Sequence, residues 1–215
     1  MTAKNGYIPA LGYDALTRFY DPFIRWFLRE ATFKNALIEQ AQIAPHHRVL
    51  DVGCGTGTLT LMTKHAVPTA EVVGIDGDPR ILAIARAKAG HAAVQFDEGL
   101  ATALPYPDAS FDRIVTSLVL HHLTTTDKER TFAEMLRVLR PGGELHIADW
   151  AKPVGFFART AFRAVQLFDG PTTRDNVEGR IPGMVAGAGF VDVTAARTIQ
   201  TIGGTIGLLQ ARKEH

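Results

Sequence analysis

The sequence predicts an α/β fold with a doubly wound parallel sheet, on three observations. From residue 47 onward, short runs rich in β-branched residues alternate with stretches of helical periodicity. A glycine-rich turn over residues 53–57 joins the first of these runs to the first helical stretch. Near the end of the chain, Gly203 and Gly204 separate two β-rich runs, as in an antiparallel hairpin. Strands that alternate with helices pair in parallel through right-handed crossovers, so we expect helices on both faces of the sheet.

The composition fits one soluble domain and excludes several classes of protein. The chain has 215 residues, of which 46% are hydrophobic and 21% charged. Its net charge of +1 argues against nucleic-acid binding, which normally needs a basic excess. Cys54 is the only cysteine, so an intramolecular disulfide and a multi-cysteine metal site are excluded, and we expect no metal. There is no apolar run of 18 residues and no apolar signal core, so we expect a cytoplasmic protein without a membrane span.

The elements are expected in the following order along the chain. Residues 1–45 are expected to be helical, because apolar side chains recur at spacings of three and four, as at Phe19, Phe23 and Trp26. Strands are expected at residues 48–52, 71–75, 93–96, 111–117 and 144–148, with helices between them at about 57–66, 79–90 and 126–139. The last third is expected to hold helices at 155–169 and 173–187 and strands at 190–201 and 205–211. Residues 1–8 and 212–215 are expected to be disordered.

The glycine-rich turn indicates that the backbone approaches a ligand at the start of a helix, where unpaired N–H groups are available. A dinucleotide-binding loop that begins at Gly53 and Gly55 would need its third glycine or alanine at position 58, which is Thr58. Asp51, at the end of the preceding strand, would repel a pyrophosphate but suits a ligand that carries an ammonium group. These residues disfavour a nicotinamide-dependent dehydrogenase.

A second acidic residue, Asp76, ends the second expected strand. At the tip of the neighbouring strand, its carboxylate can accept hydrogen bonds from both hydroxyls of a ribose. The alternative is that Asp76 is a simple turn residue. Asp78 and Pro79 have a clearer structural role, as the N-cap and first residue of the next helix.

Several runs together resemble the class I S-adenosylmethionine-dependent methyltransferases, and in particular the branch with the ubiquinone/menaquinone methyltransferases. The glycine loop of residues 49–57 resembles the first motif of that family, and Val-Val-Gly-Ile-Asp at 72–76 resembles the second. Further similar runs are Leu-Pro-Tyr-Pro-Asp-Ala-Ser-Phe-Asp at 104–112, Leu-His-His-Leu at 120–123, Arg-Val-Leu-Arg-Pro-Gly-Gly-Glu at 137–144 and Ala-Gly-Phe-Val-Asp-Val at 188–193. The resemblance covers roughly residues 45–212.

The resemblance implies a Rossmann-like, seven-stranded sheet whose last strand is antiparallel, with a helical lid at residues 1–45. The methyltransferase domain would then cover 46–215, with an acceptor-side helical insertion at about 152–188. S-adenosylmethionine would be the cofactor and S-adenosylhomocysteine the product. The expected cofactor-binding residues are Tyr20, Asp51, Gly53, Cys54, Gly55, Asp76, Gly77, Leu100, Ala101 and Ser117. Leu100 departs from the family, whose members often have an aspartate there to meet the adenine amino group.

The chemistry is expected at the carboxyl ends of the strands, near the switch in strand order. The catalytic candidates there are His121, His122 and Asp149. Adjacent histidines point in different directions, which disfavours a metal pair. One of them could act as a base or touch the substrate, since histidine titrates near neutrality, or could have only a structural role. Asp149 could be a base, bind a cationic substrate or cap the following segment.

Aromatic residues are concentrated in two stretches, which hold 12 of the 18 in the chain, at residues 7–33 and 156–168. Both stretches flank the part that resembles the cofactor-binding sheet, so we expect them to border an apolar acceptor pocket. The expected substrate-contacting residues are Tyr13, Trp26, Trp150, Phe157 and Phe162. For the first stretch, ordinary packing and a membrane-interface helix remain as alternatives to a lid.

The function expected from these features is methyl transfer from S-adenosylmethionine to a small, partly apolar organic acceptor by in-line displacement. The chain lacks the Asn/Asp-Pro-Pro-Tyr/Phe run of many N-methyltransferases that act on planar amino groups. Two alternatives are a phospholipid N-methyltransferase at a membrane surface and a non-catalytic cofactor-binding protein on the same fold. We expect a small-molecule acceptor, no nucleic-acid partner, at most weak membrane-surface contact, and a monomer or homodimer.

Overall fold

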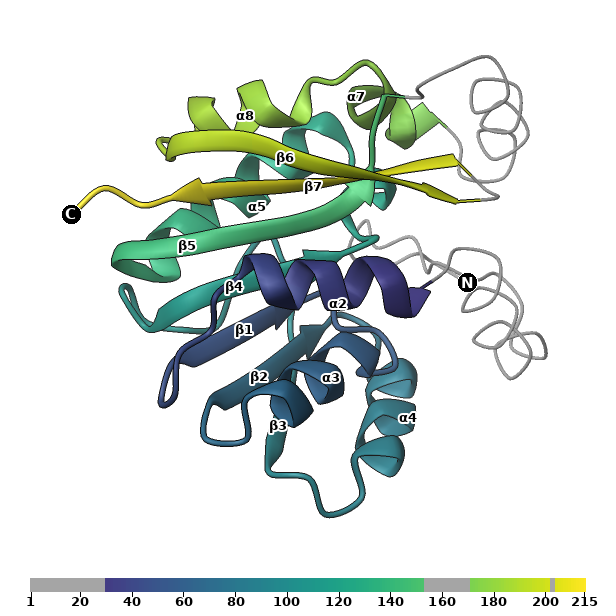
Figure 1. The fold of residues 1–215 in the computed structure, drawn as a ribbon, viewed down its shortest axis with the longest axis vertical. Helices are drawn as coiled ribbons and strands as arrows, with labels where there is room; N and C mark the ends of the chain where they lie inside the picture. The colour runs from purple at the N-terminus through teal and green to yellow at the C-terminus, as the bar shows by residue number, and fades with distance from the viewer. Residues whose placement is uncertain (1–29, 153–170, 202–203) are drawn as a thin grey trace, which may run out of the picture.

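A computed structural model describes residues 30–152, 171–201 and 204–215, and it contains one seven-stranded sheet (Figure 1). The strands are β1 (Arg48–Val52), β2 (Glu71–Asp76), β3 (Val94–Glu98), β4 (Phe111–Ser117), β5 (Leu139–Trp150), β6 (Val191–Thr201) and β7 (Gly204–Arg212). Their order is β3-β2-β1-β4-β5-β7-β6. The first five are parallel, whereas β7 is antiparallel to both β5 and β6. The predicted α/β fold with an antiparallel last strand is therefore confirmed.

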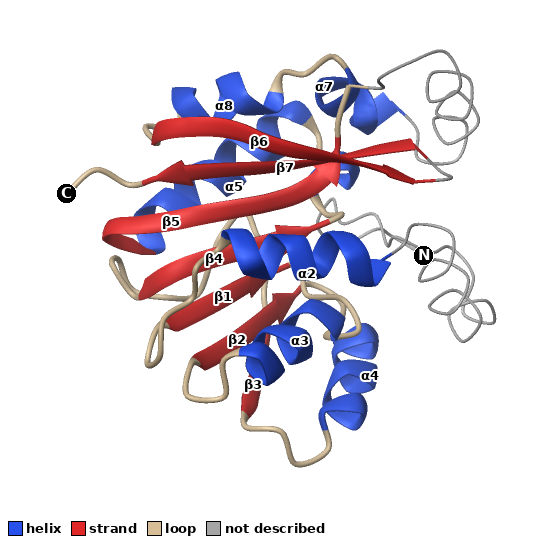
Figure 2. Ribbon diagram, viewed as in Figure 1, coloured by secondary structure: helices blue, strands red, loops and turns tan. Residues whose placement is uncertain are grey.

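Helices cover both faces of this sheet (Figure 2). One face carries α2 (Glu30–Gln40), α3 (Thr58–Ala66) and α4 (Pro79–Ala89), and the other carries α5 (Thr125–Val138) and α8 (Ile181–Gly187). Three short helices, η1 (Leu120–His122), η2 (Pro171–Thr173) and α7 (Arg174–Val177), lie near the ends of the strands. The helix α4 starts as predicted, since Asp78 accepts a hydrogen bond from the Arg80 N–H at 2.9 Å and Pro79 follows.

The two core layers follow from the alternation of side chains along each strand. In β1, Leu50 and Val52 join the cluster under α5 and α8, while Val49 joins the cluster under α2 and α3. Asp51 lies two residues after Val49 and therefore points to the same face as α2 and α3, where it is 1% exposed. A carboxylate is thereby buried on a face that is packed mainly by apolar residues.

Two predicted elements were wrong in their bounds. The strand predicted at 144–148 begins earlier, because Leu139 already pairs with Phe111, before a register shift brings Glu144 opposite Arg113. The single helix predicted over 173–187 is instead two helices, α7 and α8. Gly179 lies between them with φ of +75°, a left-handed conformation that interrupts a helix.

The C-terminal end was also predicted incorrectly as disordered. Arg212 is the last residue of β7, and the Lys213 N–H donates to the Gly143 carbonyl at 2.9 Å. The hairpin is confirmed, although Gly204 pairs with Thr201 and so belongs to β7 rather than to the turn. The helix predicted at 155–169 and the first 29 residues of the predicted N-terminal helix lie outside the described residues.

The strand order places a switch point between β1 and β4. From β1 the chain continues outward to β2 and β3, and it then returns to pair β4 on the other side of β1. In open α/β sheets, ligands bind in the crevice outside the carboxyl ends of the strands at such a point. The carboxyl ends of β1, β2, β4 and β5 therefore define where the functional site is expected.

Candidate active site

The glycine loop after β1 packs directly beneath the segment that follows β4. Gly53, Gly55 and Gly57 all have positive φ values, of +70°, +55° and +75°. A Cβ atom on Gly53 would lie 2.4 Å from a methyl carbon of Val119, so this position has room only for glycine. A Cβ atom on Gly55 would meet nothing within 4 Å. The loop thus contacts Val119 on one side and leaves open space beside its backbone at Gly55.

Asp76 lies at the tip of β2, beside this loop. One of its carboxylate oxygens accepts from the Gly55 N–H at 2.9 Å, and the other from the Asp78 N–H at 3.0 Å. Burial raises the pKa of Asp76, although these backbone hydrogen bonds oppose the effect. A carboxylate has about four acceptor positions, so each oxygen keeps the capacity for one further hydrogen bond.

The residues expected to surround an adenine come just after the ends of β2 and β3. Gly77 comes directly after Asp76, and the Gly99 N–H donates to the Asp76 carbonyl at 3.0 Å, which brings the start of the next loop alongside. In that loop Leu100 is 41% exposed, while the neighbouring Ala101 packs partly against the main core. An exposed leucine at this place offers the apolar surface that a flat ring can cover.

Asp51 and Cys54 differ in what they can offer a ligand. The Asp51 carboxylate accepts from the Thr60 hydroxyl at 2.6 Å, and burial raises the pKa of Asp51 to about 6. Cys54 packs in a small apolar cluster with Leu82, Ala85 and Phe96, and burial raises its thiol pKa far above the usual value. The Cys54 side chain therefore serves packing, and only its backbone is available to a ligand.

Asp149 organises the opposite side of the site. One carboxylate oxygen accepts from the N–H groups of Val119 and Leu120 at 3.0 and 2.8 Å. The other accepts from the Trp150 N–H at 2.7 Å and from the Asn176 amide of α7 at 3.2 Å. Burial favours the neutral acid, but the charge of His121 and these hydrogen bonds keep the pKa of Asp149 below its usual value. Asp149 is thus an ionised acceptor that holds η1 and α7 in place.

His121 is bound to this carboxylate through its Nδ1 atom, 2.7 Å from the second Asp149 oxygen. An ionised carboxylate can only accept, so Nδ1 carries a proton, and in the neutral form of the ring Nε2 presents a lone pair. The His121 ring lies edge-on to Trp150 with ring centres 6.1 Å apart, and 3.9 Å from the ring of His122. Burial and the neighbouring His121 lower the pKa of His122 to about 4, so His122 is neutral near pH 7.

The structure therefore brings most of the described site residues to one edge. Ser117, half-buried at the end of β4, lies between the glycine loop and Asp149, since β4 pairs with both β1 and β5. The remaining predicted site residues, Tyr13, Tyr20, Trp26, Phe157 and Phe162, lie outside the described residues.

Sequence reasoning missed Asn176 and Lys34. Asn176 belongs to a four-residue helix, and no local pattern connects it with Asp149. Lys34 had a usable signal, because a lysine three residues before Leu37 lies on the apolar face of α2. It is only 8% exposed, and its charge acts on Asp51.

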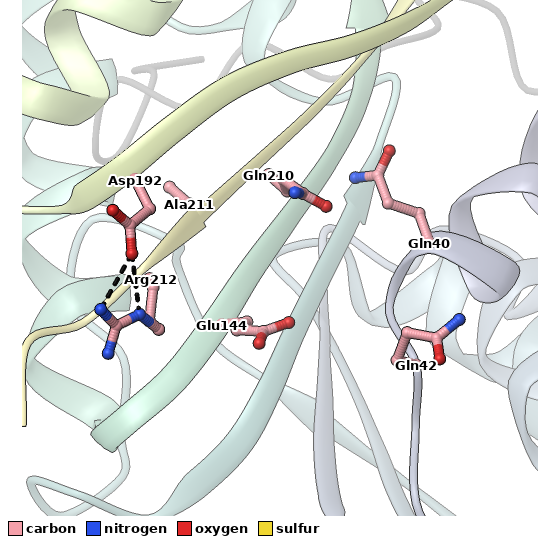
Figure 3. A pocket seen from close by; sticks show the side chains of 7 residues that line it. All are labelled: Gln40, Gln42, Glu144, Asp192, Gln210, Ala211 and Arg212. Atoms are coloured by element: carbon pink, nitrogen blue, oxygen red, sulfur yellow. Dashed lines mark hydrogen bonds and ion pairs between the residues drawn. The ribbon is translucent and has the colours of Figure 1, made fainter.

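A separate pocket of about 340 Å³ lies at the other end of the sheet (Figure 3). Gln40 of α2, Glu144 of β5 and the end of β7 line it, with an ion pair between Asp192 and Arg212 at 2.9 Å. None of the predicted site residues lines this pocket, because they lie where the parallel strands end. It is therefore not part of the candidate active site.

Two other kinds of feature are absent from the part of the chain that the structure describes. No three His, Cys, Asp or Glu side chains are grouped there so that they could hold a metal ion. No helix in that part is long and apolar enough to cross a membrane.

Comparison with known proteins identifies the family. Residues 49–143 match the methyltransferase domain family. The chain is 37% identical over 166 residues to a demethylmenaquinone methyltransferase of Thermus thermophilus, an alignment that covers 74% of this chain and 71% of the relative. It is also 37% identical over 153 residues to a demethylmenaquinone methyltransferase of Deinococcus radiodurans, covering 70% of this chain and 61% of that protein.

A solved structure supports the fold alone. The phosphoethanolamine N-methyltransferase 2 of Haemonchus contortus, in complex with phosphomonomethylethanolamine and S-adenosylhomocysteine, superposes with a TM-score of 0.74 at 14% identity. The superposition covers 94% of this chain and 58% of that one. The matched domain and the Thermus relative show that the chain, which has this fold, belongs to the class I S-adenosylmethionine-dependent methyltransferases.

Proposed function

We propose that this chain transfers the methyl group of S-adenosylmethionine to a small, partly apolar organic acceptor by in-line displacement. The observation that carries the proposal is the meeting of two groups at one edge of the sheet. Asp51, the glycine loop and Asp76 form one side, and the His121–Asp149 pair forms the other, with Val119 packed between them. Since both named relatives are demethylmenaquinone methyltransferases, a reduced quinone ring is the first acceptor to test.

The residues present fit the cofactor. The open space beside Gly55 admits a ligand against the backbone, and Asp76 keeps acceptor capacity for two ribose hydroxyls. Asp51 offers a carboxylate to the methionine ammonium, and exposed Leu100 offers a surface for adenine, with Gly77 and Ala101 beside it. We propose the same cofactor role for Gly53, the Cys54 backbone, Ser117 and Tyr20.

In the mechanism we propose, this chain supplies alignment and one proton acceptor. When bound, the cofactor supplies an electrophilic methyl group on a sulfonium. His121 Nε2 takes the proton that the acceptor loses as the new bond to the methyl group forms, and Asp149 keeps the ring oriented for this. Proximity and orientation contribute roughly 7–11 kcal/mol to such a displacement, and a positioned base contributes roughly 10²- to 10⁴-fold in rate.

We propose that aromatic residues near the carboxyl ends of the strands line the acceptor pocket. Trp150 is 6% exposed and lies against His121, which suits an apolar ring brought near Nε2. We propose that residues 1–45, as a lid, and the insertion at about 152–188 complete the pocket through Tyr13, Trp26, Phe157 and Phe162.

The proposal is tested by incubating the protein with S-adenosylmethionine that carries an isotope-labelled methyl group and with a panel of acceptors. The panel contains a short-chain demethylmenaquinol, a catechol and a small amine. We expect label in the quinol product by mass spectrometry. A protein that binds S-adenosylhomocysteine but labels none of these would favour a non-catalytic cofactor-binding protein.

The proposed contact between Asp51 and the methionine ammonium predicts a pH dependence of cofactor affinity. In the free protein the pKa of Asp51 is about 6, under the combined influence of burial, the Lys34 ammonium and the Asp76 carboxylate. An ammonium partner favours the ionised form, so affinity is constant above this pKa and falls by up to about tenfold per pH unit below it. Calorimetric titration with S-adenosylhomocysteine between pH 5 and 8 measures this pH dependence, because the expected loss of affinity begins near the Asp51 pKa of about 6.

Asp51→Asn provides the comparison for that titration. The amide does not titrate, so its affinity should be weaker at pH 8 and should lack the decline near pH 6. A decline of equal size in this variant would assign the pH dependence to another group.

A further inference from the structure

The helix α2 ends over β5 and β7, and it begins toward the carboxyl edge of the sheet (Figure 1). Near its C-terminus, the Gln40 amide contacts the His146 ring at 3.2 Å and donates to the Leu209 carbonyl at 3.1 Å. His146 lies three residues before Asp149 in β5, and Leu209 of β7 pairs with Ile147. From there α2 extends back so that its first turn lies on the side of the molecule where the parallel strands end (Figure 1). Glu30 and Lys34 lie in the first half of α2, and the Lys34 charge acts on Asp51.

Lys34 is a buried charge that the proposed mechanism does not use. Its side chain is 10% exposed, and its ammonium is paired with Glu30, whose side chain is 12% exposed. The Lys34 ammonium has three donors, and among the described residues Glu30 is its one hydrogen-bond acceptor. An ammonium at this depth normally has more partners, since desolvation is costly.

The charges around Lys34 are complementary to an amino acid. Asp51 projects from β1 onto the face that α2 and α3 cover, and the Lys34 charge reaches it there, lowering the Asp51 pKa against the effect of burial. The face of the sheet under α2 thus holds a buried carboxylate and a buried ammonium whose charges act on each other. The methionine part of the cofactor carries the opposite pair, an ammonium and a carboxylate.

We infer that Lys34 binds the α-carboxylate of the cofactor, while Asp51 binds its ammonium. This inference rests on cofactor binding by this chain. It explains why a lysine is buried on the apolar face of a helix beside Phe33 and Leu37, both 0% exposed. It also gives α2 a function, because the hydrogen bonds of Gln40 fix the helix that carries Lys34 to the sheet.

The test compares two ligands that differ only in the carboxylate. S-adenosylhomocysteine has it, and 5′-(3-aminopropylthio)-5′-deoxyadenosine keeps the ammonium and lacks it. Lys34→Met should weaken binding of S-adenosylhomocysteine roughly 10- to 100-fold, as expected for a lost hydrogen bond between charged groups. It should change binding of the aminopropyl analogue by less than about threefold. Isothermal titration calorimetry of both ligands measures the effect without needing an acceptor.

Lys88→Met is the matched control, because Lys88 also lies at the glycine loop, where its ammonium donates to the Thr56 and Thr58 hydroxyls at 2.9 Å. Its affinity for both ligands should stay near that of the wild type. A selective loss in Lys88→Met, or an equal loss of both ligands in Lys34→Met, overturns the inference. Unchanged affinity in Lys34→Met also overturns it.

Lys34→Met leaves Glu30 buried without its partner. A second variant therefore separates a lost ligand contact from a loss of folding. The double variant E30Q/K34M removes both charges, and it should show the same selective loss of S-adenosylhomocysteine. If the wild type binds neither ligand, cofactor binding itself fails, an outcome distinct from a failure of the Lys34 inference alone.

Discussion

Replacing His121 by alanine is expected to lower turnover roughly 100- to 10,000-fold while leaving cofactor affinity within about threefold of the wild type. The reason is that His121 Nε2 is the proposed proton acceptor, held by the 2.7 Å contact between Nδ1 and Asp149. The cofactor contacts are proposed to come from other residues, chiefly Asp51 and Asp76. Steady-state turnover with the best acceptor of the panel and calorimetry with S-adenosylhomocysteine measure the two quantities separately.

His122→Ala is the matched comparison, since it removes the adjacent ring. Within the part of the chain that the structure describes, His121 and not His122 is hydrogen-bonded to Asp149, and a pKa of about 4 makes His122 a weak base. We therefore expect a smaller loss of turnover than in His121→Ala. A larger loss in His122→Ala, or near-normal turnover in His121→Ala, would show that His121 is not the base.

Replacing Asp76 by alanine is expected to weaken S-adenosylhomocysteine binding roughly 100- to 10,000-fold. Two hydrogen bonds to a charged carboxylate contribute about 1.5–3 kcal/mol each, which accounts for a loss of this size. The substitution also removes the acceptor of the Gly55 and Asp78 N–H groups, at 2.9 and 3.0 Å. The glycine loop then loses its tie to β2, which adds to the loss.

Asp78→Ala separates the ribose role from a general effect on this turn. Asp78 caps α4 through the Arg80 N–H, so its loss should cost about 1 kcal/mol of folding stability. Its affinity for S-adenosylhomocysteine should remain within a few-fold of the wild type. Unchanged affinity in Asp76→Ala would exclude the ribose role.

The parts of the fold that could be predicted are those that local pattern determines. Strand β4 was predicted at its observed bounds. The turn residues before it mark its start, and the β-rich run itself marks its length. The beginning of β5 could not be predicted, since Leu139 joins the sheet only by pairing with Phe111, a partner 28 residues away. The break at Gly179 was missed because one glycine within a helical pattern is not by itself a reliable end.

The same distinction holds for the site. The positions of Asp51, Asp76 and the glycines at one edge of the sheet could be predicted, because each lies at the end of an expected strand in the sequence. The role of Asp149 could not be settled in this way, because it depends on Asn176 and the η1 backbone, which only the fold brings to its carboxylate. The burial of Lys34 beside Asp51 likewise depends on how α2 crosses the sheet.

The most direct test of the central claim, that the tips of β1 and β2 hold the cofactor, is calorimetric titration of the wild-type chain with S-adenosylhomocysteine. We predict saturable binding of one ligand per chain, with a dissociation constant below about 1 mM and a marked loss in Asp76→Ala. The absence of binding at millimolar ligand by a folded protein would contradict the account.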